Sequence, residues 1–477
     1  MTETSSAQKI APGPPGHPIV GNLEQMRKDP LRFLLDARRE YGNVVRLKLG
    51  PMLVHLVSHP DWIHYVLAAH HENYHKSADY KTLEPLIGHG LITSENGLWE
   101  RERKLAQPAF HLDRIKAFGT LMTDAAQAML ERWQGYAQSG QPFDLAPEHS
   151  RLTMTVVARA LFTSDISDEA SEVGKALTIA LHRAEEVSQS LIPIPLSVPT
   201  PSNRRVQSAI RTLDKVVYGM IEERRRSGED RGDLLSMLMA ARDADSGETM
   251  NDQQLRDEVM TLFVAGHETT ANALTWTWYL LAKSPPVARR LRAELDQVLG
   301  GRAPTVDDLP KLPYLLQVVQ EALRLYPPAW LIGRTPIQDD EIAGYHIPAG
   351  STIMMSQYVT HRHPDFWEQP EGFDPDRFAA HPPPAYFPFG GGPRVCIGNN
   401  FALIEARLVL ATVAQRYRVE LVPGHPVEPE SMITLRPRYG VQVTLRPYQP
   451  AQQPQPAAPA PAPRPLELRG RVGGDGA

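Results

Sequence analysis

Cysteine is almost absent from this sequence, and its scarcity excludes several kinds of site. Cys396 is the only cysteine among 477 residues, so the chain cannot form an intramolecular disulfide. It also cannot bind zinc or an iron–sulfur cluster through several thiolates. A strong net charge is lacking too, because 50 Lys and Arg residues nearly balance 55 Asp and Glu residues. No overall field therefore favours a nucleic acid or an anionic membrane as a partner.

Segments typical of export or membrane insertion are also lacking. Residues 1–10 contain no basic region followed by an apolar one, so we expect neither a secretion signal nor a membrane anchor. The protein is therefore expected to be cytoplasmic. One stretch, 260–282, approaches the length of a membrane span. Glu268 lies near its centre and would cost on the order of 2.5 kcal/mol or more in a bilayer. This stretch is therefore predicted to be a long helix in the core of a soluble domain.

The composition is that of an ordinary globular protein, with 42% apolar and 22% charged residues. Its hydrophobic periodicity is mostly helical, and a few alternating stretches interrupt it. The predicted segments are an extended Pro-Gly start at 11–23, a β-hairpin at 44–49 and 52–57, helices from 60 to 302 with a connector at 191–201, and strands within 340–355. We therefore expect a mainly α fold with small β-sheets.

One large domain is predicted, flanked by two ends of different character. No internal repeat or abrupt linker interrupts residues 11–447, so we expect a single domain there, acting as a monomer. Residues 1–10 are predicted to be a flexible N-terminus. Residues 448–477 are rich in Pro, Ala and Gly and too poor in apolar residues to offset the entropy of ordering, so they are predicted to be a disordered tail.

The lone cysteine lies in a glycine-rich loop, from Phe389 to Gly398, that leads into an apolar helical run. Free backbone N–H groups and the helix dipole at such a position stabilise a thiolate. A phosphate-binding loop is excluded, since no Gly-Lys-Ser/Thr follows. From these residues alone, an inert buried thiol remains an alternative, because free cysteines are among the most buried residues.

The whole string around Cys396 resembles the haem-ligand signature of the cytochrome P450 family. The pattern Phe-x-x-Gly-x-Arg-x-Cys-x-Gly is matched at all five fixed positions, which are Phe389, Gly392, Arg394, Cys396 and Gly398. The resemblance implies that the Cys396 thiolate binds the iron of protohaem (haem b) and donates electron density toward O–O cleavage. It also implies that the glycines allow backbone N–H groups to approach the sulfur.

A second motif lies on the long predicted helix. Asn251 is a plausible N-cap with Gln254 three residues later, and two prolines follow at 285–286, which predicts a helix of about 32 residues. His267-Glu268 does not begin a zinc-protease motif, because residue 271 is alanine. A packing glycine and a satisfied threonine would explain the middle of this helix. Alternatively, Gly266 and a Thr269 hydroxyl turned back to the carbonyl of Ala265 would open the helix locally.

Ala265-Gly-His-Glu-Thr-Thr270 resembles the oxygen-groove motif of the same family. The resemblance implies that Thr269 orients the bound dioxygen and that Glu268 relays protons from solvent. It also places Ala265 and Gly266 against the haem. His267 has no role in the motif and is predicted to be a structural or surface side chain.

Glu321 and Arg324 lie on the polar stripe of a helix predicted at 313–326, and on pattern alone they are a solvated ion pair. The resemblance implies a different role, in which Arg377 completes a buried network that holds the cysteine loop in place. The histidines at 70–71 and at 361 and 363 lack the spacing of metal ligands and are predicted to be polar loop residues.

Four residues, of which Arg394 also belongs to the cysteine signature, match the family's positions for binding the haem carboxylates. Each arginine among them, taken alone, would be a surface charge, but an arginine fork suits a carboxylate. The four residues are Trp99, Arg103, Arg334 and Arg394.

The resemblance extends over residues 11–447 and implies the cytochrome P450 fold, with haem held between the long helix and the helix after the cysteine loop. The expected activity is that of a haem-thiolate monooxygenase, which inserts one atom of O₂ into an organic substrate by hydroxylation or epoxidation. Electrons would come from NAD(P)H through a ferredoxin or flavodoxin with its reductase, because no such domain is encoded. A peroxide-using or isomerising haem-thiolate protein and a haem-based sensor are the alternatives.

The substrate cannot be identified from the sequence, but aliphatic residues near the motifs predict an apolar pocket. We expect a lipophilic small molecule there, such as a terpenoid, steroid, fatty acid or macrolide. The residues predicted to line the pocket are Leu86, Ile87, Leu91, Phe263, Ala329, Leu331 and Ile433.

Overall fold

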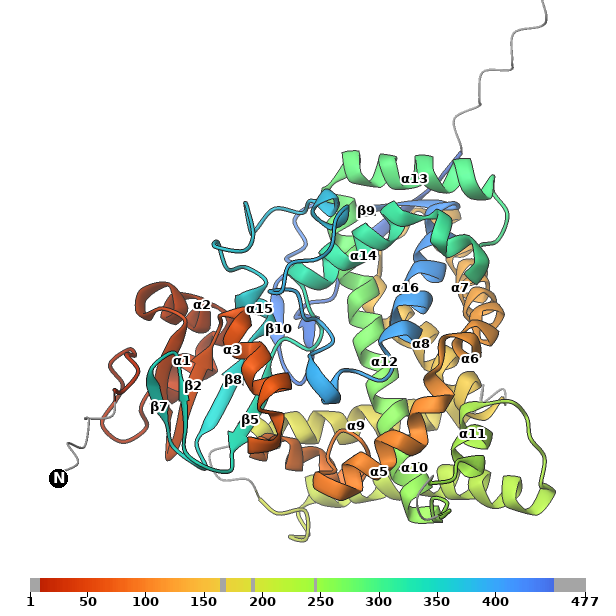
Figure 1. The fold of residues 1–477 in the computed structure, drawn as a ribbon. Helices are drawn as coiled ribbons and strands as arrows, with labels where there is room; N and C mark the ends of the chain where they lie inside the picture. Colours follow the sequence, from red (N-terminus) through yellow and green to blue (C-terminus); the bar gives the residue numbers. More distant parts are fainter. Residues whose placement is uncertain (1–8, 164–168, 190–193, 244–246, 450–477) are drawn as a thin grey trace, which may run out of the picture.

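The structure is a computed structural model that describes residues 9–163, 169–189, 194–243 and 247–449 (Figure 1). Most of the two predicted flexible ends, 1–8 and 450–477, and part of the predicted connector, 190–193, lie outside the described residues. Hydrogen bonds attach both ends of the described region to the fold. The backbone N–H of His346 donates to the carbonyl of Lys9, and the Tyr448 hydroxyl donates to Asp296 at 2.5 Å. Because these bonds tie both segments to the fold, residues 9–10 and 448 belong to it.

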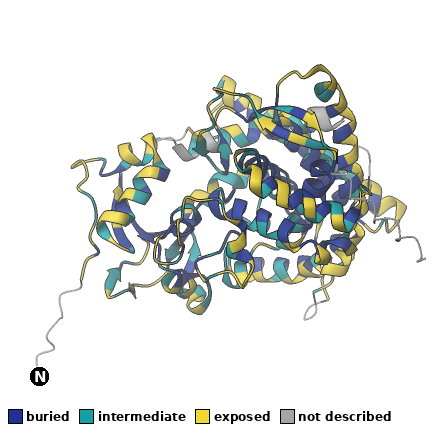
Figure 2. Cartoon of the chain, turned by 90° about the horizontal axis from the view of Figure 1, so that it is seen from above, coloured by how far each residue is buried: buried dark blue, intermediate teal, exposed yellow. Residues whose placement is uncertain are grey.

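Helices make up most of the described chain, as predicted. The 32-residue helix α12 (Asp252–Lys283) runs through the centre, where α8 (Leu145–Phe162), α14 (Pro313–Leu325) and α16 (Asn399–Ala414) pack against it (Figure 1). Buried residues concentrate in this central group, and the exposed faces of the helices point outward (Figure 2).

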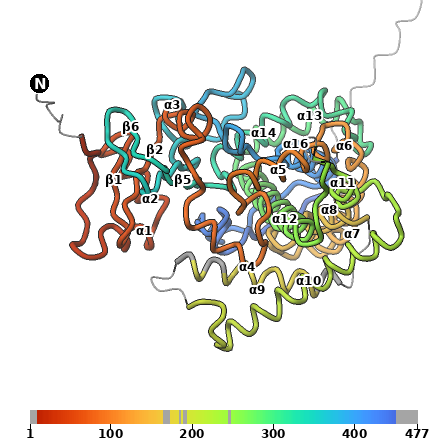
Figure 3. The backbone as a smooth tube through the Cα atoms, turned by 60° about the horizontal axis from the view of Figure 1, so that its bottom comes forward, coloured from red at the N-terminus to blue at the C-terminus, as the bar shows by residue number. Residues whose placement is uncertain are grey.

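Further helices surround this centre. Helices α9 (Glu169–Gln189) and α10 (Pro201–Ser227) pack on each other along one side (Figure 3). The others are α3 (Pro60–His64), α4 (Glu84–Ile87), α5 (Asn96–Ala106), α6 (Leu112–Ala117), α7 (Gly119–Ser139), α11 (Leu234–Ala240), α13 (Pro285–Leu299) and α15 (Gln357–Thr360).

A five-stranded sheet lies at one side of the helical body, beside α1 (Leu23–Lys28) and α2 (Pro30–Tyr41) (Figure 1). Its order is β1 (Val44–Leu49), β2 (Met52–Val57), β8 (Thr352–Met355), β5 (Ile332–Pro336) and β3 (Tyr74–Lys76). The antiparallel pair β1–β2 is the predicted hairpin. Smaller sheets are formed by β4 (Phe143–Asp144), β12 (Gln442–Pro447) and β9 (Tyr417–Leu421), by β6 (Asp340–Ile342) and β7 (Tyr345–Ile347), and by β10 (Pro429–Ser431) and β11 (Leu435–Pro437).

Helix α12 begins as its sequence predicts. The side chain of Asn251 accepts from the backbone of Gln254, and the Gln254 side chain accepts from the backbone of Asn251, so both partners of a capping box are present. The Thr269 hydroxyl donates to the carbonyl of Ala265 at 2.6 Å, as expected. The predicted local opening does not interrupt the helix, which is continuous through these residues. Within the ranges that the structure describes, no helix has both the length and the apolar character needed to cross a bilayer.

Candidate active site

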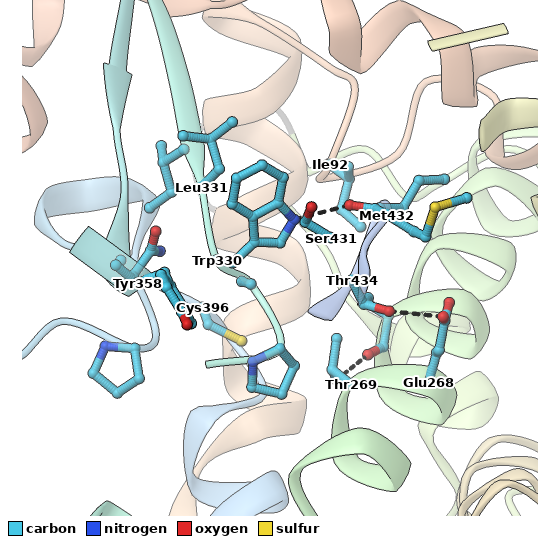
Figure 4. A pocket seen from close by; sticks show the side chains of 18 of the residues that line it. Ile92, Glu268, Thr269, Trp330, Leu331, Tyr358, Cys396, Ser431, Met432 and Thr434 are labelled. Atoms are coloured by element: carbon cyan, nitrogen blue, oxygen red, sulfur yellow. Dashed lines mark hydrogen bonds between the residues drawn. The ribbon is translucent and has the colours of Figure 1, made fainter. Parts of the chain in front are cut away.

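A cavity of about 1,700 Å³ includes the space between α12 and the loop that precedes α16, and it extends outward to α1 and α2. Ala265, Gly266 and Thr269 line it from α12. From the opposite side it is lined by Phe389, Gly398 and Cys396, and the Cys396 sulfur is labelled in Figure 4. The two motifs, more than a hundred residues apart in the chain, therefore face each other across one space. Each side supplies mostly apolar surface, and a single thiol lies on one of them.

The loop around Cys396 is held in a tight turn. The backbone N–H of Cys396 donates to the carbonyl of Phe389 at 3.0 Å. Gly392 adopts a φ of +66°, and a Cβ atom there would collide with the carbonyl oxygen of Leu67, so this position requires glycine. Burial raises the pKa of the Cys396 thiol, while the Gly398 N–H and Arg103 act in the opposite direction. A cation bound to the sulfur is what would hold it as a thiolate.

The four residues matched to the haem carboxylates all line the same cavity. Arg394 donates to Glu95 at 2.6 and 2.9 Å, and its guanidinium lies 5.1 Å from the ring centre of Trp99. Arg103 donates to the carbonyl of Val395 at 3.0 Å, and Arg334 donates to the carbonyl of Gly333 at 2.8 Å. Among the described residues, no acid forms an ion pair with either of these two arginines. Their charges are therefore available to carboxylates of a ligand.

Sequence reasoning missed two charged residues in this group. Lys76 lies opposite Arg334 in the β3–β5 register and donates to the carbonyls of Leu91 at 3.0 Å and Ser94 at 2.5 Å. Burial lowers the pKa of Lys76 to about 7, and Glu95 acts against this shift. Glu95 links the backbone of Lys76 to Arg394. No motif marks either residue, because strand pairing and a long-range ion pair bring them to the cavity.

The acid and the alcohol of α12 both line the cavity, but they differ in their partners (Figure 4). Thr269 bonds within its own helix, to Ala265. Glu268 accepts a hydrogen bond at 2.7 Å from the hydroxyl of Thr434, a residue between β10 and β11. His267 is buried, lies 2.8 Å from the Ser150 hydroxyl, and its pKa is lowered to about 4 by burial. His267 is thus a neutral structural side chain, as predicted.

The pattern-based prediction of a solvated Glu321–Arg324 pair is wrong, because both side chains are fully buried. Arg324 donates to Glu321 at 2.6 and 2.8 Å, and Arg377 donates to the same carboxylate at 3.2 Å. Arg324 also donates to the carbonyls of Pro370 and Gly372. The segment 361–378 therefore covers the polar stripe of α14, and the three residues form the arrangement that the resemblance implied.

The histidines at 361 and 363 lie in the loop after α15, as predicted, but both are buried. His361 is fully buried, and its Nε2 accepts from the backbone N–H of Phe387 at 3.0 Å. Its Nδ1 therefore carries the proton and donates to the carbonyl of Arg324, 3.2 Å away. His361 thus connects the buried ion network to the loop segment that leads into the cysteine loop. His363 is buried as well and bonds to Asn43 at 2.8 Å.

The predicted pocket residues divide into two groups. Leu91, Ala329, Leu331 and Ile433 line the cavity, whereas Leu86, Ile87 and Phe263 do not and belong to the main hydrophobic core. Phe263 is buried in the main hydrophobic core, although its neighbours Leu262 and Val264 line the cavity. Trp330, Ile92 and Met432 are wall residues that sequence reasoning did not name.

Beside the cavity, Glu102 of α5 and Glu258 of α12 form a pair of buried carboxyl groups, 1% and 0% exposed. Burial raises the pKa of Glu102 to about 7 and raises the pKa of Glu258 well above its usual range. Between its ordinary pKa of 4.5 and about 7, Glu102 stays protonated in the folded chain but ionises in the unfolded chain. The free energy of unfolding therefore falls as the pH rises through this window.

We expect Glu102→Gln to raise the free energy of unfolding at about pH 8 by roughly 1–3 kcal/mol and to have little effect at about pH 5. The amide has the shape of the protonated acid but cannot ionise. Urea unfolding at both pH values measures the change, with Glu100→Gln, an exposed residue of the same helix, as the control. Equal pH dependence of Glu102→Gln and wild type would contradict this prediction.

This fold and cavity define a class of protein. A mainly helical chain presents one cysteine on a glycine-rich loop, opposite a long helix. The cavity between them has apolar walls, and at its edge Arg103 and Arg334 form no ion pair with any described acid. These residues fit a flat iron cofactor that has two carboxylates and takes one sulfur ligand. The class is that of the haem-thiolate proteins.

The chain belongs to the cytochrome P450 family, whose sequence model, described as "Cytochrome P450", matches residues 11–445. It is 40% identical over 434 residues to cyclooctatin synthase of Streptomyces melanosporofaciens, covering 89% of this chain and 93% of that protein. It is 36% identical over 414 residues to cyclooctat-9-en-7-ol 5-monooxygenase of the same organism, covering 85% and 89%. The crystal structure of cytochrome P450DA heme domain is similar, with a TM-score of 0.85, 29% identity, and coverage of 93% and 99%.

Membership of this family makes the chain a cytochrome P450 monooxygenase, with haem-thiolate iron as its cofactor and O₂ as its co-substrate. The predicted class of fold, the cofactor and the type of enzyme are thereby confirmed.

Proposed function

We propose that this chain hydroxylates or epoxidises an apolar, terpenoid-like substrate, with electrons from a separate ferredoxin or flavodoxin and its reductase. In a hydroxylation, a C–H bond, O₂, two electrons and two protons yield a C–OH group and one water. The observation that carries this proposal is that the thiol of Cys396, the Glu268–Thr269 pair and an aliphatic wall line one cavity.

The proposed haem site uses the residues at the two sides and the edge of the cavity. Cys396 would bind the iron, while Ala265, Gly266, Phe389 and Gly398 would contact the flat faces of the cofactor. When bound, the haem activates O₂ for transfer of one oxygen atom to the substrate. Its carboxylates would be held by Arg103, Arg334 and Arg394 together with the indole of neutral Trp99, and we add Lys76 to these residues.

Glu268 and Thr269 have separate proposed roles in the delivery of protons. The Thr269 hydroxyl donates its only hydrogen to Ala265 at 2.6 Å, so its oxygen can accept a hydrogen bond from a water in the cavity and hold that water in place. Glu268 has an ionisable carboxylate and can recharge such a water with a proton from solvent. This acid–alcohol pair favours O₂ over peroxide as the oxidant, because preformed peroxide already contains the protons that the pair would deliver.

The buried network on α14 has a supporting role in this proposal. Glu321, Arg324 and Arg377 would fix the segment that leads into the cysteine loop, with His361 as the connection to it. Removing one member of such a network leaves a buried charge unpaired and is strongly destabilising.

The substrate class is proposed from the wall of the cavity. Leu91, Ala329, Leu331 and Ile433 contribute aliphatic surface to this wall. One Streptomyces relative supports this proposal, since its printed name, cyclooctat-9-en-7-ol 5-monooxygenase, describes a substrate with an alkene and an alcohol. We infer a substrate with a hydrocarbon skeleton and few polar groups.

Titrating the ferric protein with cyclic terpenoids, steroids, fatty acids and sugars tests the substrate class. We expect spin-state shifts of the haem absorption with the lipophilic compounds and none with sugars. Turnover of the compound that binds most tightly, with surrogate ferredoxin and reductase, should give one oxygenated product per two electrons. A sugar that shifts the spin state while no lipophilic compound does would refute the proposal, as would turnover with peroxide that no redox partner can replace.

A further inference from the structure

The carboxylate of Glu268 is tied to the turn between β10 and β11, which lies next to α12 at the cavity wall. The Thr434 hydroxyl donates to Glu268 Oε1 at 2.7 Å (Figure 4). Asn272 Nδ2 donates to the Thr434 hydroxyl oxygen at 3.0 Å. Thr434 is 6% exposed and Asn272 is 7% exposed, so water competes little for either bond. Asn272 lies one helical turn after Glu268 on α12, so both ends of this chain of hydrogen bonds start from one helix.

The direction of these bonds is set by the number of hydrogens available. A hydroxyl has one hydrogen, and in Thr434 the oxygen already accepts from the amide of Asn272. Its hydrogen is therefore directed to Glu268, where a charge-assisted bond forms when the carboxylate is ionised. The Asn272 amide polarises the hydroxyl and strengthens this bond.

The turn that carries Thr434 is itself firmly attached. Trp330 Nε1 donates to the carbonyl of Met432 at 2.8 Å, and the backbone of Leu435 donates to the carbonyl of Pro328 at 2.9 Å. On the other side, Trp276 Nε1 from α12 donates to the carbonyl of Leu435 at 3.0 Å. These bonds hold the turn in place, so the Thr434 hydroxyl is a fixed point rather than a mobile side chain.

We propose that Thr434, supported by Asn272, is a positioning residue that holds the Glu268 carboxylate at the cavity wall in the geometry required for proton supply. This inference rests on the relay role proposed for Glu268. A carboxylate without this bond would adopt several rotamers, and only a fraction of them would place an oxygen against the water that Thr269 holds. The same turn contributes Ile433 and Met432 to the wall, so the substrate pocket and the relay share one structural element.

The test replaces Thr434 with valine, which keeps the shape of the side chain and removes the hydroxyl. We expect turnover to fall about tenfold, with a larger solvent isotope effect, while haem content and substrate affinity stay within about twofold of wild type. Thr434→Ser restores the hydroxyl and should recover most of the lost rate. Thr277→Val is the matched control, since Thr277 is a buried threonine of α12 whose hydroxyl bonds only to its own helix, at Ala273.

A double-mutant comparison shows whether Thr434 acts through Glu268. In a Glu268→Gln background, Thr434→Val should cause little further loss, because the anionic partner is already gone. Full additivity of the two losses, or a Thr434→Val rate equal to that of wild type, would overturn the positioning role. If Glu268→Gln alone leaves turnover unchanged, it is the proposed relay function that fails.

Discussion

Replacing Cys396 with serine should abolish monooxygenase activity and remove the thiolate ligand from the haem. A serine hydroxyl is far less acidic than a thiol, so it cannot supply an anionic donor of comparable strength. The reduced carbon monoxide adduct of the variant is expected to lose the red-shifted Soret band that a thiolate ligand produces. Difference spectra of wild type and variant, normalised to total haem, measure this loss.

The outcome is specific to this residue, because Cys396 is the only cysteine in the chain and no second thiol can replace it. Ser431→Ala serves as a control, since Ser431 lines the same cavity but lies on β10 rather than in the cysteine loop. The control should keep the thiolate spectrum. A red-shifted band that persists in Cys396→Ser would show that the assigned ligand is wrong.

Replacing Thr269 with alanine should divert electrons from product to hydrogen peroxide, while haem content and substrate binding remain. Without the hydroxyl, the water that delivers the proton loses its partner in the cavity, so protonation no longer outcompetes the release of reduced oxygen as peroxide. We expect the product formed per NADPH to fall by about an order of magnitude. Peroxide and product, each measured per NADPH consumed, give the ratio directly.

Thr269→Ser is the informative companion, because it keeps the hydroxyl and should keep most of the coupling. Glu268→Gln should behave differently, since it slows the recharging of the relay and lowers turnover more than it changes the ratio of peroxide to product. An unchanged ratio together with unchanged product formation in Thr269→Ala would mean that Thr269 only packs against its own helix.

Two electrostatic environments meet in this cavity. At the edge, Arg103, Arg334 and Arg394 outnumber their single bound acid, Glu95. Around Leu331 and Ile433 the wall is aliphatic. A cofactor with two carboxylates and a lipophilic substrate would therefore occupy different parts of one space, and neither needs to displace the other.

Much of the site was predictable because its motifs are continuous in the chain. The cysteine loop needs a glycine at 392 and a helix directly after residue 398, and both requirements are local. The capping box of Asn251 and Gln254 and the bond from Thr269 to Ala265 connect residues three or four apart, so helical geometry alone sets them. Hydrophobic alternation likewise predicted the β1–β2 hairpin with the correct bounds.

The sequence by itself determined the family, the candidate thiolate ligand and the course of the central helix, because each depends on neighbouring residues or on a fixed local spacing. Only the tertiary structure decided that Glu321, Arg324 and His361 are buried, since the covering segment lies tens of residues away. It also decided that Phe263 is buried in the core and that Lys76 lies opposite Arg334 on neighbouring strands. The hydrogen bond from Thr434 to Glu268 likewise depends on tertiary packing. The physical reason is that periodicity shows which residues share a face of an element, whereas what covers that face depends on how distant elements pack.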